Sequence, residues 1–382
     1  MTDFIFRINP NIILGPYTIS RLGEQVKEWG SRYMVILDPL LNEAKLAEKI
    51  LQSLIDRKVE SFVFAEIAEG NTTKVIQRAL GLAREGHVHG IIAVGGAKAL
   101  NIGRTVAALF NEDGDFYSYI DKTSPSAPAL PCICVPTTFR YTHCFTPTIP
   151  LTDSRSNQLK IVNVQNTITK LILVDPNMML SLTENQKATF SLELICMATE
   201  AYLSQKANFF SDMYVEKALE ILSYALDGSP SLEISTPEEV LLAQAGCMIS
   251  LASATASLGI GSLISMGINS RFHKSKSLVS SIMLPYILED TAKFKEAKLA
   301  KIAQLLRAAT PDLSGEESAK ALIEYIRQKI AKYNLPTRLK DLQLTVENLS
   351  LIVEDIGKID IINTLPRSMT SDDLFSFIKV AY

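Results

Sequence analysis

The sequence contains no apolar run approaching the roughly 20 residues that a membrane-spanning helix needs. Its first residues, MTDFIFRINPN, lack the apolar core of a signal peptide. It also has no low-complexity tract and no internal repeat. The net charge is only −3 at pH 7, so electrostatics favours neither nucleic acid nor an anionic membrane as a partner. These absences predict a cytoplasmic globular protein.

Cysteine and histidine are also scarce. Five cysteines, an odd number scattered through apolar runs, predict reduced thiols rather than a disulfide framework. Cys132 and Cys134 would face the same side of one strand, where core packing is favoured over a metal or redox role. His87 and His89 have metal-like spacing, but no acidic residue or cysteine lies nearby in the sequence, which disfavours ligation.

The first half of the chain does contain a regular alternation of apolar strands and amphipathic helices. Strands are expected at 4–8, 11–15, 32–38, 59–66, 90–96, 131–136 and 170–176, with helices at 18–29, 41–57 and 71–86. This alternation predicts a doubly wound, Rossmann-like parallel sheet in an α/β domain spanning residues 1–178. Within it, the polar loop 152–158 between two short apolar runs predicts a β-hairpin over 145–164.

Strand signals vanish from Glu184 onward, and nearly everything that follows has helical periodicity. We expect an all-helical domain over residues 179–382. Breaks are predicted at Gly228, Pro237, Pro285, Pro311, Pro336 and Pro366. The stretch from Ser253 to Asp290 predicts two helices joined near residues 269–275.

Two segments of the helical half carry a resemblance to a known family. Residues 258–285 fit the frame of a motif G-x-x-H-A-M-A-H-x-L-G, followed by a third His and then L-P-H; residues 193–202, ELICMATEAY, fit D-A-L-T-H-A-I-E-A-Y. The chain therefore resembles the iron-containing (group III) alcohol dehydrogenases over essentially its whole length. The resemblance implies the dehydroquinate synthase-like fold of that family and an NAD(P)-linked reduction of a small aldehyde or ketone, or the reverse oxidation.

The residues at the family's metal-ligand positions differ from the motif. Glu193 stands in place of Asp, and Met197, Ser262 and Lys276 stand in place of three His ligands. Iron or zinc needs imidazole and carboxylate donors. An ammonium within a few Å of a metal cation in a poorly solvated cleft also repels that cation, by roughly several kcal/mol. The sequence thus predicts that no metal binds. Lys276 is expected to pair with Glu193 instead, replacing the charge of the ion.

The resemblance also implies a dinucleotide site at the carboxyl edge of the sheet. Asp38, which ends a strand, matches the family's ribose-binding Asp, although an Asp before Pro39 is also an ordinary turn residue. Gly95 and Gly96, with Lys98 and Asn101, match the pyrophosphate turn G-G-G-S-x-x-D. A glycine pair at a strand-to-helix turn is, however, required simply to build such a fold.

A third segment of the implied site departs further from the family. Residues 136–144 match P-T-T-A-G-T-G-S-E, but Arg140 and Thr142 replace both glycines, so bulky side chains are expected to hinder the approach of a nucleotide. Thr137 and Thr138 retain hydroxyls that can donate hydrogen bonds. Lys160 matches a family lysine that faces the nucleotide, with a solvated hairpin lysine as the alternative.

Several functions remain open at this stage. One is a metal-free reductase using NAD(H) or NADP(H), in which Lys276 polarises the carbonyl, Glu193 pairs with it and His273 relays a proton. Another is a catalytically inactive relative that serves in binding, assembly or regulation, as a homo-oligomer or beside an active paralogue. A third is a different reaction of an anionic ligand held in the interdomain cleft by Lys98, Arg140 and Lys276.

Overall fold

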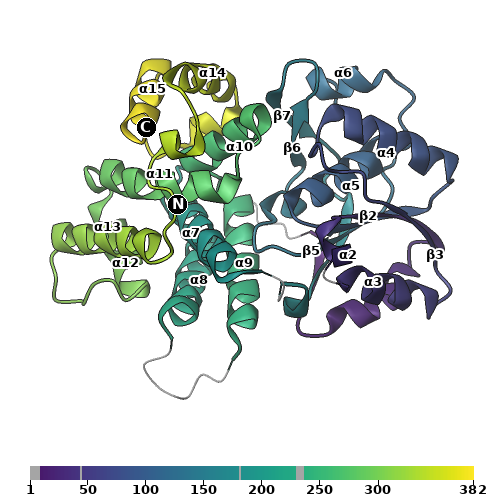
Figure 1. The fold of residues 1–382 in the computed structure, drawn as a ribbon, viewed down its shortest axis with the longest axis horizontal. Helices are drawn as coiled ribbons and strands as arrows, with labels where there is room; N and C mark the ends of the chain where they lie inside the picture. The colour runs from purple at the N-terminus through teal and green to yellow at the C-terminus, as the bar shows by residue number, and fades with distance from the viewer. Residues whose placement is uncertain (1–8, 44, 180–181, 229–235) are drawn as a thin grey trace. The chain divides into compact units, whose positions relative to one another are not determined.

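The computed structural model describes residues 9–43, 45–179, 182–228 and 236–382. The chain forms two compact units, Met1–Ser181 and Leu182–Tyr382. Figure 1 shows strands and helices in the first unit and helices in the second. The strand expected at residues 4–8 lies outside the described residues.

The first unit is built on a six-stranded sheet in which every pair of neighbouring strands is parallel. Its order is β1-β8-β5-β4-β2-β3. The strands are β1 (Asn11–Leu14), β2 (Arg32–Leu37), β3 (Glu60–Phe64), β4 (Gly90–Gly95), β5 (Cys132–Pro136) and β8 (Thr169–Val174). The parallel, doubly wound sheet predicted from the sequence is therefore confirmed.

Helices cover both faces of this sheet (Figure 1). They are η1 (Thr18–Arg21), α1 (Leu22–Val26), α2 (Leu40–Glu43), α3 (Leu46–Ile55), α4 (Thr73–Glu85), α5 (Ala97–Leu109) and α6 (Phe116–Asp121). Tyr33, Val35 and Leu37 of β2 join a core cluster with residues of α1 and α3, whereas the alternate residues Met34 and Ile36 are buried outside this cluster. Because successive side chains of a strand point to opposite faces, β2 is buried on both.

The predicted hairpin is also present. Strands β6 (Thr148–Asp153) and β7 (Gln158–Asn163) pair antiparallel, and they lie between β5 and β8 in the sequence. Two 3₁₀ turns, η2 (Thr142–Phe145) and η3 (Pro176–Met179), precede the hairpin and follow β8.

The second unit contains only helices and 3₁₀ turns among its described residues. They are α7 (Glu184–Leu203), α8 (Phe209–Asp227), α9 (Glu238–Thr255), α10 (Ile260–Phe272), α11 (Lys276–Ala292), α12 (Glu296–Leu305), α13 (Gly315–Lys332), η4 (Leu339–Leu342), α14 (Val346–Ile356), η5 (Asp360–Thr364) and α15 (Ser371–Val380). Most residues of α7 are buried, so this helix forms the centre of the unit. The turn predicted within 269–275 lies between α10 and α11.

Three local predictions were wrong. Pro285 does not break a helix but lies inside α11, where Ile282, Met283 and Leu284 are buried; packing of this apolar segment overrides the local cost of proline. The helix expected over 41–57 is divided into α2 and α3, with Lys45 at a φ of 56° before α3. The helix expected over 18–29 begins as a 3₁₀ turn and ends at Val26.

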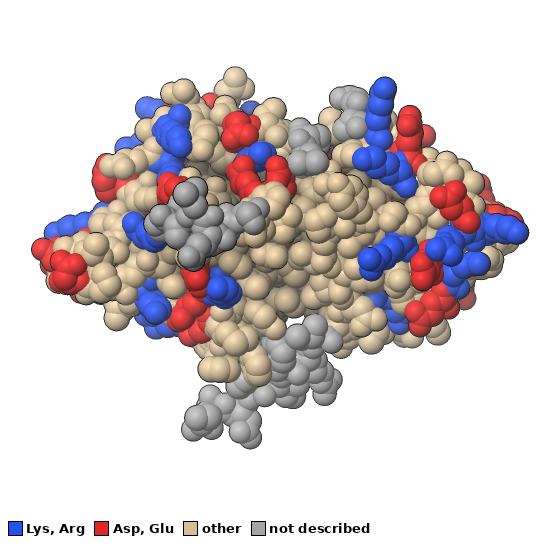
Figure 2. All heavy atoms as spheres, turned by 90° about the horizontal axis from the view of Figure 1, so that it is seen from below, with Lys and Arg blue, Asp and Glu red and all other residues tan. Residues whose placement is uncertain are grey.

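Surface charge is mixed. On the face displayed in Figure 2, basic and acidic side chains are interspersed. Within the described ranges no single helix is long and apolar enough to cross a membrane; only α9 and α10 meet that criterion together, as a pair bent by 98°.

Candidate functional site

Three neighbouring strands of the sheet end beside one another and bring the predicted dinucleotide residues together. Leu37 of β2 pairs with Val94 of β4, and Gly95 of β4 pairs with Pro136 of β5. The Thr137 N–H then donates to the Gly95 carbonyl at 3.1 Å. The carboxyl ends of parallel strands are the usual ligand edge of such sheets. Asp38, the glycine pair and Thr137 thus share this edge.

The turn after β4 requires a glycine at its first position. Gly95 has a φ of +144°, and a Cβ on it would lie 2.8 Å from Asp38 Cβ and 3.0 Å from Ala99 Cβ. Gly96 has an ordinary φ of −75° and caps the start of α5. The close approach at Gly95 therefore places the half-buried Asp38 carboxylate against the turn that begins α5. A carboxylate there can accept ribose hydroxyls, while the helix N-terminus favours a phosphate.

The other two residues of this turn have different surroundings. Lys98 is exposed. Asn101 is buried, and its side-chain amide donates to the Pro150 carbonyl at 3.0 Å; Asn71 donates to the same carbonyl at 2.7 Å. Asn101 thus ties α5 to the β6–β7 hairpin, a structural role that the sequence did not indicate.

The segment from Thr137 to Cys144 is largely buried. Thr137 is buried and Thr138 half-buried. Phe139 is 1% exposed and Tyr141 is 3% exposed, so both rings are in the protein interior. Arg140, between them, is half-buried. The large side chains that replace the family's small residues are therefore accommodated mainly within the fold.

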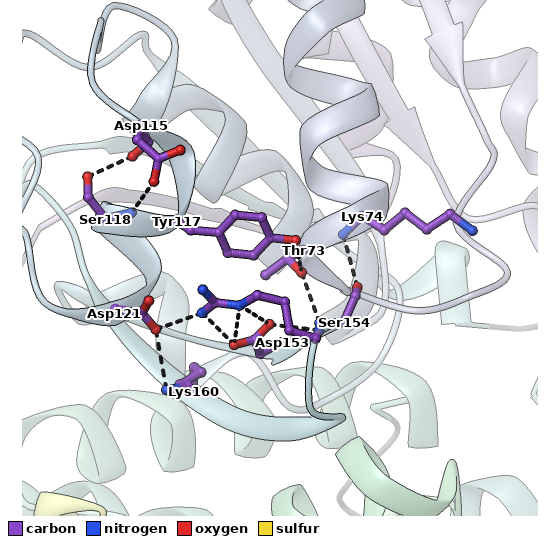
Figure 3. A network of polar contacts seen from close by, with 10 residues as sticks. Thr73, Lys74, Asp115, Tyr117, Ser118, Asp121, Asp153, Ser154 and Lys160 are labelled. Atoms are coloured by element: carbon purple, nitrogen blue, oxygen red, sulfur yellow. Dashed lines mark hydrogen bonds and ion pairs between the residues drawn. The ribbon is translucent and has the colours of Figure 1, made fainter.

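Lys160 belongs to a polar network at the tip of the hairpin (Figure 3). Its Nζ lies 3.5 Å from Asp121 Oδ1, and Arg155 Nη2 donates to the same oxygen at 2.7 Å. Arg155 also bonds Asp153, and its guanidinium stacks 4.1 Å from the centre of the Tyr117 ring. The hydrogen bond from Arg155 lowers the pKa of Asp121. An anion that binds Lys160 must therefore compete with a carboxylate.

Sequence reasoning singled out Lys160 but missed the rest of this network. A hydrogen bond between Thr73 Oγ1 and the N–H of Ser154 joins the hairpin tip to the start of α4. Arg155 stands in the polar loop between β6 and β7, and α6, which carries Tyr117, was not predicted. Spacing in the sequence offers no signal for contacts of this kind.

In the second unit, α7 carries two of the family's metal-ligand positions, Glu193 and Met197, together with Glu200. Glu193, Met197 and Glu200 follow at spacings of four and three residues and so share one face of the helix. The buried Glu200 carboxylate accepts hydrogen bonds from the N–H groups of Gly259 and Ser262, each at 3.0 Å. The Ser262 hydroxyl donates to it at 2.5 Å. Glu200 thereby caps α10, and burial raises its pKa.

The remaining predicted residues lie at the start of α11 and before it. Glu193, also buried, accepts a hydrogen bond from Ser277 Oγ at 2.7 Å. Lys276 is the half-buried first residue of α11, and its ion pair with Glu193 stays a prediction. His273 is exposed and ends α10 at a φ of 54°.

This donor set does not fit iron or zinc. Of the four positions, only Glu193 offers a carboxylate and none offers an imidazole; Met197 is fully buried and the Ser262 hydroxyl is bonded to Glu200. Across the described residues, no three His, Cys, Asp or Glu side chains are placed to hold a metal ion. That includes His87 and His89, which are both exposed.

Comparison with known proteins identifies the family. Residues 9–176 match the family model of iron-containing alcohol dehydrogenases, and residues 187–382 match that of the family's C-terminal domain. The chain is 22% identical to the 1,3-propanediol dehydrogenase of Citrobacter freundii, covering 98% of this chain and 97% of the relative. It is 20% identical to the lactaldehyde reductase of Escherichia coli K12, with 98% of each chain covered.

Solved structures show the same fold. The crystal structure of a 1,3-propanediol oxidoreductase has a TM-score of 0.91, with 20% identity and full coverage of both chains. That of the sulfoacetaldehyde reductase of Bifidobacterium kashiwanohense, solved with NAD⁺, has a TM-score of 0.84 at 16% identity and covers 100% of this chain and 99% of the other. The chain therefore belongs to the iron-containing alcohol dehydrogenase family, as its residue pattern predicted.

Proposed function

We propose that this protein is an oxidoreductase that uses NAD(H) or NADP(H) to interconvert a small aldehyde or ketone and its alcohol without a metal ion. The observation that carries the proposal is the edge of the sheet where Asp38 lies against Gly95 and the start of α5. This arrangement suits a ribose and a pyrophosphate. The relative solved with NAD⁺ supports the same cofactor class.

The chemistry assigned to the chain's own residues is electrostatic. When bound, the dinucleotide supplies the hydride that reduces the carbonyl carbon, and the carbonyl oxygen must then gain a proton. The Lys276 ammonium is assigned to polarise the oxygen, with Glu193 as its counter-ion. His273 or a water molecule is assigned to relay the proton. The poor metal donors at Met197 and Ser262 support this metal-free route.

A first test is titration of the full chain with NADH and NADPH, followed by nucleotide fluorescence and thermal unfolding. Micromolar binding should raise the melting temperature, since nucleotide at 100 times its Kd stabilises by about 2.7 kcal/mol. Asp38→Ser should weaken NADH binding. The matched variant Asp56→Ser, at the end of α3, should not. Failure to bind up to about millimolar nucleotide, weaker than roughly 4 kcal/mol, would reject the reductase.

A second test concerns Lys276. If nucleotide binds and a carbonyl substrate is turned over, Lys276→Ala should lower kcat more than it changes nucleotide affinity. Lys274→Ala, two residues away, is the matched control and should keep the parent rate. Unchanged turnover in Lys276→Ala would remove the ammonium from the mechanism.

A second candidate function is that of a catalytically inactive relative acting in binding, assembly or regulation. The observation that favours it is the engagement of two former ligand positions in buried hydrogen bonds, Ser262 with Glu200 and Glu193 with Ser277. These bonds join α7 to α10 and α11, as structural residues would. Absence of nucleotide binding in the titration would favour this function. The search would then turn to protein partners and to anionic ligands of Lys98, Arg140 and Lys276.

A further inference from the structure

Strand β3 is the last strand on one side of the six-stranded sheet, and it pairs only with β2. Figure 1 shows β3 at the margin of the sheet. The dinucleotide proposal concerns the carboxyl ends of β2, β4 and β5 and does not involve this strand. An edge strand presents backbone groups to which a further strand can bond.

The outward-facing backbone groups of β3 belong to Ser61 and Val63. The N–H of Glu60 donates to the Ser31 carbonyl at 2.8 Å, so Glu60 and every second residue after it bond toward β2. Ser61 and Val63 therefore direct their N–H and C=O groups away from the sheet. Within the described ranges these groups bond to no other residue. The edge thus offers two donors and two acceptors.

Exposed apolar side chains accompany this edge. Val63 itself is 42% exposed. Ile55, at the end of α3, is 63% exposed, and α3 packs against β3. Leu82 of α4 is 40% exposed and lies one helical turn before Gly86, where a Cβ would be 2.7 Å from the Phe62 ring. Open backbone groups beside apolar side chains favour a protein strand as the partner.

A second copy of β3 is complementary to the first when the two run antiparallel. If Phe62 lies opposite Phe62 of the second copy, Ser61 lies opposite Val63 of that copy. Each such pair then exchanges two hydrogen bonds between N–H and C=O groups. All five residues of the strand are paired in this register, and every outward group of Ser61 and Val63 is satisfied.

The charges beside β3 agree with this register. It brings Lys58, two residues before the strand, toward Glu66 of the second copy, two residues after it, and both side chains are exposed. A register that opposes the two copies of Val63 would instead place Glu60 opposite Glu66. Like charges directly opposite each other are destabilising. Charge complementarity therefore favours pairing about Phe62.

We propose that two copies of this chain associate through β3, antiparallel about Phe62, so that their two sheets become one continuous sheet. The contact is isologous, because each copy contributes the same strand. Since the strand is short, we expect a Kd of about micromolar. The proposal does not rest on nucleotide binding or on any reductase activity, so it stands or falls separately from the proposed function.

Sedimentation equilibrium of the full chain tests this pairing. The mass should rise from that of one 42.1 kDa chain toward that of two between about 1 and 100 μM. Val63→Pro should raise the Kd about tenfold or more, because it removes one outward N–H from each copy and leaves the bonds to β2 intact. Val63→Thr keeps that N–H and should associate like the parent. A monomer at every concentration, which would leave the edge for a strand of another protein, would overturn the proposal. So would a Kd unchanged in a folded Val63→Pro variant.

Exchange of charges tests the register. Lys58→Glu and Glu66→Lys should each weaken association at low ionic strength, where surface charges are least screened. An equimolar mixture of the two variants should associate more tightly than either alone, because both contacts then join opposite charges. Lys58→Glu mixed with Glu220→Lys, a change at an exposed residue of α8, is the matched control and should not gain affinity in this way. A mixture no tighter than the separate variants would reject antiparallel pairing about Phe62.

Discussion

At the scale of single residues, Arg104 of α5 is a buried cation whose hydrogen-bond acceptors are neutral oxygens and not a carboxylate. It is 1% exposed, and it donates to Thr169 Oγ1 at 3.0 Å and to the Thr146 carbonyl at 2.6 Å. No ion pair joins it to any residue of the described ranges. Burying a charge is costly unless hydrogen bonds satisfy it, so these contacts are expected to stabilise the join between α5, β8 and the hairpin.

Replacing Arg104 with Met should therefore lower the free energy of unfolding by about 2–3 kcal/mol, since buried acceptors lose their donors. Equilibrium urea denaturation measures this change. Arg78→Gln is the surface control, because Arg78 is partly exposed in its pair with Glu66, and it should change stability by less than about 0.5 kcal/mol. Equal unfolding midpoints for Arg104→Met and the parent would contradict the structural role.

Glu112 is a second buried, hydrogen-bonded side chain, and its contribution to stability should depend on pH. Burial alone would raise its pKa, but hydrogen bonds from Tyr119 Oη and from the N–H groups of Ala127 and Ser126 hold the pKa below its usual value of 4.5. A carboxyl group with a lowered folded-state pKa contributes stability above its unfolded pKa and loses it as the pH falls through the folded value. Its contribution should thus be complete at pH 7.

Glu112→Gln should lower the free energy of unfolding at pH 7 by about 1–3 kcal/mol, because the charged acceptor of three hydrogen bonds is lost. The difference from the parent should shrink as the pH falls below 4.5. Urea denaturation at several pH values measures both effects, with the exposed Glu69→Gln as control. A difference that stays constant with pH would show that ionisation of Glu112 is not involved.

At the scale of elements, the geometry of the turn from β4 to α5 predicts that its two adjacent glycines differ in their tolerance of substitution. Gly95→Ala should cost about 2 kcal/mol or more, because alanine disfavours a φ of +144° and its Cβ would meet Asp38 Cβ at 2.8 Å. Gly96→Ala should cost less than about 1 kcal/mol, since its Cβ would meet Thr138 Cγ2 at an ordinary 3.5 Å. Thermal and urea unfolding of the two variants give the comparison. An equal loss of stability in the two variants would mean that neither the φ of Gly95 nor its close approach to Asp38 constrains this turn.

Elements with a strong periodic pattern were predictable from the sequence. The buried strands, the β6–β7 hairpin and the turn between α10 and α11 follow from hydrophobic spacing and polar loops, which are local properties. That Asp38 and the glycine turn lie at the same edge of the sheet was also predictable, because parallel strands present their carboxyl ends at one edge. The uninterrupted α11 did not follow, since burial around Pro285 outweighs its local preference.

Side-chain partners were far less predictable than elements. The bonds of Ser262 with Glu200 and of Asn101 with the Pro150 carbonyl join residues at least 49 positions apart. Nothing in the local sequence of either residue selects its partner. The sequence therefore located the candidate positions, while the hydrogen bonds that engage them depend on tertiary packing.

At the scale of the whole molecule, the fold matches that of a metal-binding family, whereas the residues at the family's metal-ligand positions do not suit a metal ion. The fold is retained across both units, as the family matches over 9–176 and 187–382 show. The donor set at Glu193, Met197, Ser262 and Lys276 is nevertheless unsuited to iron or zinc. Stability should therefore depend on packing within each unit and not on a bound ion.

Chelation should accordingly leave the melting temperature of the purified protein unchanged, and added Fe²⁺ or Zn²⁺ should not raise it. The positive control is the triple variant Met197→His, Ser262→His and Lys276→His, which combines three imidazoles with the Glu193 carboxylate. If that variant binds zinc, metal at 100 times its Kd should stabilise it by about 2.7 kcal/mol. Stoichiometric iron or zinc in the parent, measured by elemental analysis and removed by a chelator with a fall in melting temperature, would contradict the metal-free proposal. The parent and the variant differ only at three of the family's ligand positions. If metal raises the melting temperature of the variant alone, the side chains at those three positions are the reason that the parent binds no metal.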